Sequence, residues 1–291
     1  MAKVAIIGVG AIGGCLAAGL SRTGGHELTL CTRRPLNGLL RVETPDGELC
    51  VSARNLTDVT QAEVVDWVLV ATKAYDAEGA ATWFKRLCGP STLVAIVQNG
   101  VEHRKRFAPF LAKEMLVPVV IDTPAERRPD WSVWQRRALQ MKVENTPDGS
   151  AFAALFPPGS VELVDDFVTA AWHKLCINAT GAVSAILKKP VGVMQDEELG
   201  RVALDLVAEC VAVGRAAGAK LEDGLGERIL ADDRSRPPDS INSMLADHLA
   251  DRPTEVDARH GVIVRMGEKY GIPTPANRMA AALLANMSAK Q

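Results

Sequence analysis

The sequence predicts an α/β nucleotide-binding domain followed by an all-helical domain. Three observations support this fold class. The chain opens on a short apolar run that leads directly into a glycine-rich turn, strand-like segments recur as far as about residue 165, and the remainder shows helical patterns. A length of 291 residues suits two domains, which we expect at 1–165 and 166–291.

Composition excludes several classes of protein. Hydrophobic residues make up 47% of the chain, enough for sizeable cores, and a net charge of −2 provides no field for nucleic acid or an anionic membrane. The six cysteines lie apart, without zinc-like spacing. We therefore expect buried, reduced thiols, no metal site, no membrane span and a cytoplasmic protein that recognises a small molecule locally.

The first element is a buried parallel strand with a dinucleotide-binding turn. The run KVAIIG is apolar and β-branched, and it leads into a G-x-G-x-x-G motif and then a helical pattern. Gly8 permits the tight turn, Gly10 lets the backbone approach a pyrophosphate, and Gly13 lets the helix pack closely on the strand. Ala11 and Ile12 complete the turn, which we expect to bind the cofactor.

The second strand, HELTLCT, indicates which dinucleotide binds. An NAD site usually ends this strand with an acidic residue that holds the ribose 2′-hydroxyl, but here the strand ends in Thr32, Arg33 and Arg34. Arginine pairs well with a 2′-phosphate. The sequence thus favours NADP(H), although the two arginines are also compatible with an ordinary solvated loop.

The next elements are a hairpin and two further strands. RVETPDGELCVSA turns at Pro-Asp-Gly, and VVDWVLVATKAYD and STLVAIVQNG each end in polar residues. Ligands bind beyond the carboxyl ends of parallel strands, so Lys73 and Asn99 fall where the nicotinamide end of a cofactor is expected. A surface lysine and a turn-forming Asn-Gly pair are the simpler alternatives.

The segment 122–140 combines arginines and tryptophans with prolines. Basic and aromatic residues together can bind single-stranded nucleic acid. Acidic residues dilute the charge here, and alternation around residues 131–135 favours an exposed hairpin or a contact between copies of the chain. We expect no nucleic-acid partner and keep a homodimer open.

Helical periodicity dominates from residue 166, over 166–187, 197–218, 240–250, 255–270 and 276–288. Lys174 and Asn178 lie four residues apart, on one face of the first of these helices. Ser243 lies on a later helix, and Thr254 is expected to cap the next one, with Glu255 in its first turn. Each of these residues also has an ordinary structural explanation as a surface or capping residue.

Taken in order, the segments GVGAIGG, ATKAYD, QNG, WHKLCIN and SMLADHLADRPTEVD resemble the ketopantoate reductase family. The match runs through nearly the whole chain. The resemblance implies a Rossmann domain followed by a helical domain similar to that of 6-phosphogluconate dehydrogenase. It also implies NADPH-dependent reduction of 2-dehydropantoate, a 2-keto acid, to pantoate in pantothenate biosynthesis.

The resemblance also implies roles for individual residues. Lys174 matches the catalytic lysine, which can stabilise the carbonyl oxygen and give it a proton, and Glu255 matches its partner carboxylate. Asn178 and Ser243 match substrate-binding positions, and Asn99 matches a position near both nicotinamide and substrate.

For the cofactor, the resemblance implies that the glycine turn, Lys73 and Asn99 contact NADP(H). Arg33 matches the arginine that holds its 2′-phosphate.

Two departures from the family pattern leave alternatives open. Many members carry a second asparagine soon after the one matched by Asn178, but Gly181 or Ala182 stands in its place here. The segment 122–140 also differs from the family's glycine-containing stretch. A paralogue acting on another 2-oxo acid or ketone and a non-catalytic NADP-binding sensor therefore remain alternatives.

Overall fold

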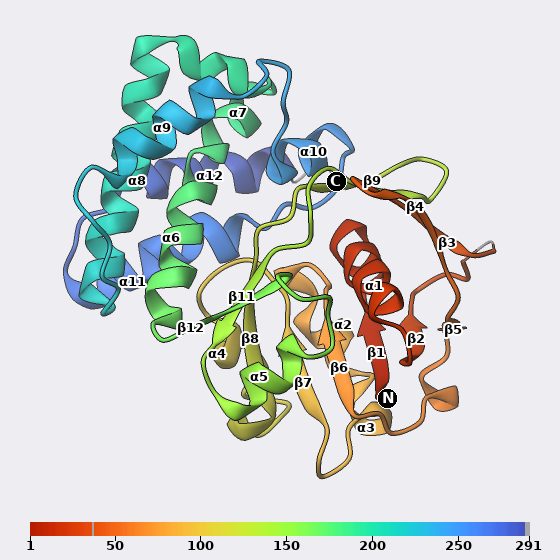
Figure 1. The fold of residues 1–291 in the computed structure, drawn as a ribbon. Helices are drawn as coiled ribbons and strands as arrows, with labels where there is room; N and C mark the ends of the chain where they lie inside the picture. The colour runs from red at the N-terminus through yellow and green to blue at the C-terminus, as the bar shows by residue number, and fades with distance from the viewer. Residues whose placement is uncertain (37, 289–291) are drawn as a thin grey trace. The chain divides into compact units, whose positions relative to one another are not determined.

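The computed structural model describes residues 1–36 and 38–288. Contacts divide the chain into two compact units. The first comprises Met1–Gln98 and His103–Phe167, and the second comprises Asn99–Glu102 and the chain from Val168 onward. Figure 1 shows strands and helices in the first unit and helices in the second, which confirms the predicted fold class.

The first unit is built on an eight-stranded sheet in the order β12-β11-β8-β7-β6-β1-β2-β5. Six adjacent strands of this sheet are parallel: β8, β7, β6, β1, β2 and β5. Strand β11 is antiparallel to β8. Chain order runs outward in both directions from β1, so it reverses between β1 and β6, where α/β proteins bind ligands. The strands are β1 Lys3–Ile7, β2 Glu27–Cys31, β5 Arg54–Leu56, β6 Trp67–Val70, β7 Leu93–Ile96, β8 Leu116–Ile121, β11 Met141–Glu144 and β12 Val161–Val164.

Alternate side chains of each strand enter two different cores. Val4 and Ile6 of β1 pack in one core with Leu16 of helix α1, whereas Ala5 and Ile7 pack on the opposite face of the sheet. This period of two explains the continuous apolar run of a strand buried on both faces. One face is covered by α1 Ala11–Thr23 and α5 Pro147–Ala153, and the other by α2 Ala77–Ala81, α3 Phe84–Leu87 and α4 His103–Phe107.

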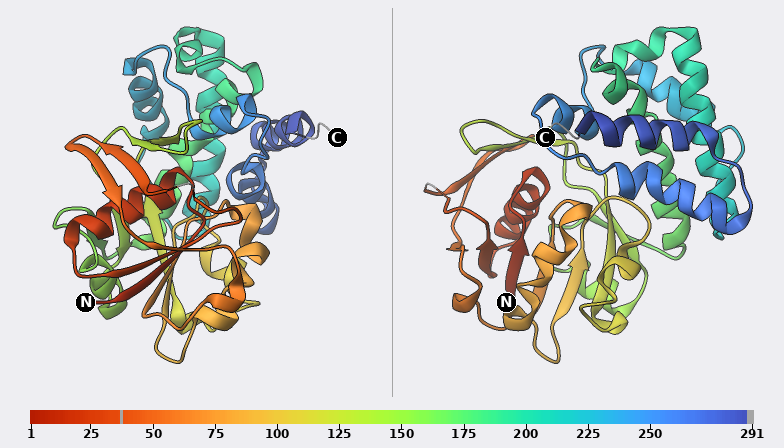
Figure 2. Two further views of the ribbon diagram at one scale, coloured as in Figure 1. Left: turned by 90° about the vertical axis from the view of Figure 1, so that its right-hand side faces the viewer. Right: turned by 180° about the vertical axis from the view of Figure 1, so that it is seen from behind.

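A second sheet of four strands, in the order β4-β3-β10-β9, lies over α1 (Figures 1 and 2). Its strands are β3 Leu40–Thr44, β4 Gly47–Val51, β9 Ala125–Arg127 and β10 Val133–Gln135. The β3–β4 pairing confirms the predicted Pro-Asp-Gly hairpin. At Gly14 of α1, a Cβ atom would lie only 2.6 Å from a methyl of Val133, so this sheet packs directly on the helix.

The Arg/Trp segment forms the β9–β10 hairpin of this second sheet. Its rings are in contact with its own arginines: Arg127 lies 4.3 Å from the Trp131 ring centroid, and Arg136 lies 4.6 Å from that of Trp134. Arg128 also pairs with Glu43 at 2.6 Å. A hairpin is confirmed, but it is not fully exposed, because Val133 and Gln135 are buried. A contact between copies of the chain stays a prediction.

The second unit consists of helices around one apolar core, which includes Trp172, Leu175 and Cys176. Its elements are α6 Phe167–Ala179, α7 Gly181–Leu187, α8 Glu197–Ala216, α9 Leu225–Ser235, α10 Ser243–Leu249, a π-helical turn Asp257–Gly261, α11 Val262–Tyr270 and α12 Pro275–Ser288. Short 3-10 turns occur at Val59–Gln61, Ala74–Asp76, Lys113–Met115 and Val191–Gln195.

Three sequence expectations need correction. Helix α9 was not predicted, because most of its residues are charged or small and only a few apolar side chains, such as Ile229, are buried. The helix expected over 166–187 breaks at Thr180. The cysteines are not all buried, since Cys50 is exposed, although burial raises the pKa of Cys15 and of Cys31 to about 12. None of the described helices is long and apolar enough to cross a membrane.

Candidate active site

The glycine turn of the first unit has the geometry of a pyrophosphate cradle. Gly8 has a φ of +91°, and a Cβ there would lie 2.7 Å from the Thr72 backbone nitrogen. A Cβ at Gly13 would lie 2.2 Å from the Gly8 carbonyl oxygen, whereas a Cβ at Gly10 would meet nothing within 4 Å. The first and third glycines are therefore required by packing, and the second leaves open space where a ligand can approach.

Helix α1 presents its N-terminus to this open space. Its N-cap is Gly10, which makes no side-chain capping bond, and its first turn contains no acidic residue. The N–H groups of Ala11, Ile12 and Gly13 belong to the first turn, where backbone donors have no partner within the helix. Such a terminus favours a phosphate electrostatically and through hydrogen bonds.

The loop after β2 carries Arg33 and is held by Asn55. The Asn55 amide donates to the Leu30 carbonyl at 2.9 Å and to the Thr32 hydroxyl at 2.8 Å, and its oxygen accepts from the Leu36 N–H at 2.9 Å. The Arg33 side chain is 80% exposed and pairs with Asp76. The guanidinium is thus at the end of β2, but an acidic side chain already occupies part of its surroundings.

Gln98 connects the ends of β6 and β7. Its buried side-chain amide donates to the Thr72 hydroxyl at 3.0 Å and to the Lys73 carbonyl at 3.3 Å, and its oxygen accepts from Arg106 at 3.0 Å. The Gln98 carbonyl oxygen also lies 2.8 Å from Nε2 of the buried His103. These bonds fix the backbone that carries Lys73, whose side chain is half-buried.

A second set of polar residues lies in the helical unit. The Asn99 amide donates to Oε2 of Glu255 at 2.8 Å, and the Asn178 amide donates to Oδ1 of Asn99 at 3.4 Å. Lys174 lies one turn before Asn178 on α6, and both are half-buried, whereas Cys176 between them is fully buried. The structure therefore brings Asn99, Asn178 and Glu255 together and places Lys174 on the same helix face as Asn178.

Glu255 is 5% exposed, which is unusual for a carboxylate that only caps a helix. Helical backbone begins at Val256, and the Glu255 carbonyl accepts the Arg259 N–H at 3.2 Å. Glu255 therefore lies directly before the helix, at the position expected for Thr254, and not in the first helical turn. Ser243 is exposed at the start of α10, and its hydroxyl accepts a hydrogen bond from Nη2 of Arg259 at 2.7 Å.

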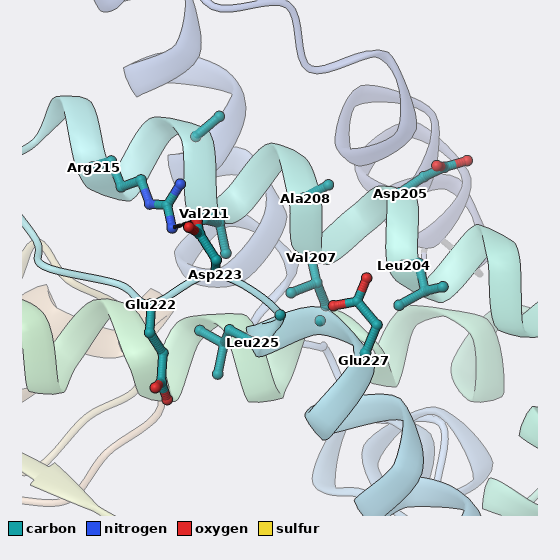
Figure 3. A pocket seen from close by; sticks show the side chains of 13 residues that line it. Leu204, Asp205, Val207, Ala208, Val211, Arg215, Glu222, Asp223, Leu225 and Glu227 are labelled. Atoms are coloured by element: carbon teal, nitrogen blue, oxygen red, sulfur yellow. Dashed lines mark hydrogen bonds and ion pairs between the residues drawn. The ribbon is translucent and has the colours of Figure 1, made fainter.

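A groove of about 360 Å³ lies elsewhere in the helical unit, between α8 and the residues leading into α9 (Figure 3). Arg215 in its wall pairs with Asp223 at 2.6 Å, and Asp205, Glu222 and Glu227 add further carboxylates. None of the predicted site residues lines it. An acidic groove disfavours an anionic keto acid, so we do not assign it to the site.

Two family models match the chain: "Ketopantoate reductase PanE/ApbA" over residues 4–148 and its C-terminal counterpart over residues 166–288. The chain belongs to the ketopantoate reductase family. It is 49% identical to the 2-dehydropantoate 2-reductase of Caulobacter vibrioides over 98% of both chains. It is 34% identical to that of Mycobacterium tuberculosis, over 98% of this chain and 97% of the other. A solved ketopantoate reductase from Ralstonia eutropha JMP134 has 32% identity and a TM-score of 0.89, with 99% of each chain covered.

Membership of the ketopantoate reductase family implies a nicotinamide cofactor. The described residues fit one, because the turn at Gly10 is open and the first turn of α1 offers backbone donors without an acidic neighbour.

The structure explains one departure from the ketopantoate reductase pattern. A Cβ at Gly181 would lie 3.2 Å from the amide nitrogen of Asn242, which donates to the Gly181 carbonyl at 3.3 Å. Oδ1 of Asn242 also accepts the N–H groups of Met244 and Leu245, both at 3.0 Å. Asn242 thus fills the space beside Gly181, and it caps α10, the helix that carries Ser243.

Three residues that shape the site escaped the sequence analysis: Asn55, Asn242 and Arg259. The contacts of Asn55 with Leu36, of Asn242 with Gly181 and of Arg259 with Ser243 join separate parts of the chain, so no local spacing reveals them. The N-cap role of Asn242 had a local signal, since asparagine directly before a helical pattern is a strong start signal.

Proposed function

We propose that this chain reduces the ketone of 2-dehydropantoate (ketopantoate) to pantoate in pantothenate biosynthesis, with NADPH as cofactor and Lys174 as proton donor. The observation that carries the proposal is the hydrogen-bonded set in the helical unit: Asn99 joins Glu255 to Asn178, one turn from Lys174. Relatives named 2-dehydropantoate 2-reductase, matched over nearly their whole length, support it. We also propose a cytoplasmic location.

The residue types suit the chemistry of a 2-keto acid. A nicotinamide, when bound, would supply a hydride for the keto carbon, and the protein would then have to stabilise negative charge on the carbonyl oxygen. A lysine ammonium stabilises that charge and can give the oxygen its proton. Glu255 accepts a hydrogen bond from the substrate's hydroxyl, while Asn178 and Ser243 orient the acid group without adding charge.

Asn99 has a positioning role in this proposal. Its amide nitrogen donates to Glu255 and its amide oxygen accepts from Asn178, so both of its polar ends are used. The Glu255 carboxylate and the α6 face are thereby held in register. A rigid arrangement of this kind aligns the substrate before reaction.

Arg33 supports NADPH rather than NADH. The residue ends β2 in place of the usual acidic residue, and its guanidinium is exposed enough to meet a 2′-phosphate. Gly8, Gly10 and Gly13 shape the turn for the pyrophosphate, and Lys73 and Asn99 are proposed to contact the cofactor.

Replacement of Lys174 tests the mechanism. We expect Lys174→Ala to lower kcat by a factor on the order of 10² or more, because a general acid is lost. Lys189→Ala is the matched control, since Lys189 is an exposed lysine of the same unit, and its kcat should stay within about twofold of wild type. Both are measured as ketopantoate-dependent NADPH oxidation. Turnover by Lys174→Ala that equals the control would reject the assigned role.

A substrate panel tests the reaction itself. NADPH oxidation is measured with ketopantoate beside other branched 2-keto acids, and each reaction is repeated with NADH. We expect the highest kcat/KM for ketopantoate with NADPH. A second candidate is a reductase of another 2-oxo acid. It is favoured because Gly181, which contacts Asn242, stands where many family members have a second asparagine. Negligible turnover of ketopantoate beside robust turnover of another acid would select that candidate.

A further inference from the structure

Arg259 is a buried cation next to the proposed substrate site. It lies in the π-helical turn Asp257–Gly261 and is only 3% exposed. Its Nη2 donates to the hydroxyl oxygen of Ser243 at 2.7 Å. No role for this arginine follows from the motif set that identifies the other site residues.

The burial of Arg259 is only partly offset by its surroundings. Its Nε is buried and has no hydrogen-bond partner among the described residues. Burial lowers the pKa of Arg259, and the nearby carboxylates of Glu255 and Asp247 partly oppose that effect. Both carboxylates are themselves only 5% exposed. A buried guanidinium with an unsatisfied N–H is costly, which indicates that its contact with Ser243 has a function.

The contact determines what the Ser243 hydroxyl can do. A guanidinium has only donors, whereas a serine hydroxyl has one donor and two acceptor positions. Because Arg259 occupies an acceptor position, the hydroxyl proton is left to be donated elsewhere. Ser243 is exposed at the first position of α10, and the Asn242 cap fixes its backbone. The result is a hydroxyl donor on an exposed residue, supported by a cation, which suits an anionic oxygen.

Charge balance favours the same conclusion. Glu255 alone would repel the carboxylate of a keto acid, yet it is needed at the substrate's hydroxyl end in the proposed function. Arg259 adds a positive charge near Glu255 and donates a hydrogen bond to Ser243, while Asp247, its other acidic neighbour, pairs with Arg252 at 3.1 Å. The anionic end of a substrate would thus be favoured at Ser243 and its hydroxyl end at Glu255.

We propose that Arg259 is a positioning residue that holds the Ser243 hydroxyl as a donor toward the substrate's carboxylate, and so makes the site selective for 2-keto acids over neutral ketones. This inference rests on the proposed function. It adds a determinant of substrate class that acts through Ser243.

The test compares ketopantoate with its amide, in which a neutral group of similar size replaces the carboxylate. We expect Arg259→Met to lower kcat/KM for ketopantoate by about 10-fold to 100-fold, mainly through KM, the usual range for a lost hydrogen bond to a charged group. For the amide the fall should be less than about threefold. Arg259→Lys, which keeps the charge, should recover part of the preference for the acid.

The ratio of kcat/KM for acid and amide is the decisive quantity. It does not depend on the fraction of folded enzyme, so a less stable variant is still informative. Arg278→Met is the matched control: it removes an exposed cation of the same unit that pairs with Glu268 at 2.5 Å and is not among the charges that act on Arg259, and it should leave the ratio unchanged. In a Ser243→Ala background, Arg259→Met should change the ratio by less than about twofold, because the two residues act together.

Two other outcomes are distinguishable. Equal losses for acid and amide in Arg259→Met would overturn this inference and leave the proposed function intact. Wild-type protein that reduces no 2-keto acid with NADPH would overturn the proposed function, and this inference with it.

Discussion

Arg33 is the residue through which we propose that the protein discriminates between NADP(H) and NAD(H). Its guanidinium is exposed and pairs with Asp76, so a 2′-phosphate would compete with that carboxylate. An ion pair this exposed contributes only about 0–1 kcal/mol, whereas a charged hydrogen bond to phosphate is worth about 1.5–3 kcal/mol. We therefore expect a 2′-phosphate to displace Asp76 from Arg33, although the carboxylate would lower the affinity.

Two variants test this balance. We expect Arg33→Ala to raise KM for NADPH by about 10-fold or more and KM for NADH by less than about twofold. Asp76→Asn should act in the opposite direction and lower KM for NADPH by a few fold, most clearly at low ionic strength, because a like charge is removed. Steady-state kinetics with both cofactors measure these effects. Equal changes for NADPH and NADH would exclude a contact between Arg33 and the 2′-phosphate.

At the scale of elements, α1 has two kinds of glycine. Gly10 at its N-terminus borders open space, while Gly14 lies against Val133 of the second sheet. The first glycine is explained by what must approach the helix, and the second by what already touches it. Only the G-x-G-x-x-G glycines could be interpreted from sequence, because the partner of Gly14 is more than a hundred residues away in the chain.

Alanine substitutions at Gly10 and Gly14 should have different effects, one on cofactor affinity and the other on the stability of the fold. Gly14→Ala places a Cβ 2.6 Å from a stiff, buried valine methyl, so we expect a loss of about 1–3 kcal/mol in unfolding free energy. Gly10→Ala meets no atom within 4 Å and keeps an ordinary φ of −83°, so stability should not fall, but affinity for NADPH should fall by about 10-fold or more. Thermal melts and cofactor titration measure the two effects. A Gly10→Ala protein that binds NADPH normally would argue against the cradle.

Across the whole molecule, the sequence predicted the fold class and the family correctly, for a physical reason. Strand β1, the glycine turn and α1 are consecutive, so their pattern is local, and the motif around Lys174 and Asn178 lies within one helix. What was missed depends on distant pairings. Strand β10 pairs with β3, and Arg259, in the π-helical turn, bonds Ser243 on a different helix.

Acid should destabilise both units. Burial lowers the pKa of His103 in the first unit and of His260 in the second to about 4. Between about pH 6.5 and pH 4 the unfolded chain therefore binds more protons at these residues than the folded chain does. Stability is complete above about pH 6.5 and falls as the pH falls, by up to about 1.4 kcal/mol per pH unit for each histidine.

Denaturant unfolding at about pH 7.5 and about pH 5 measures this dependence, because these two pH values lie above and below the ordinary pKa of histidine. His260→Gln should unfold more easily at both pH values, since the residue contacts Asn277, but the difference between the two pH values should shrink. An unchanged difference would mean that other groups cause the acid sensitivity.

The segment Asn99–Glu102 has a consequence for recombination between relatives. It lies within the stretch matched by the N-terminal family model, yet it belongs to the helical unit, where Asn99 bonds Glu255 and Glu102 pairs with Arg265 at 2.7 Å. A gene fusion that joins the first 165 residues of one homologue to the remainder of another would give these two side chains foreign partners. In a chimaera of two family members, residues 99–102 should therefore come from the same parent as the helical unit, although they precede it in the chain.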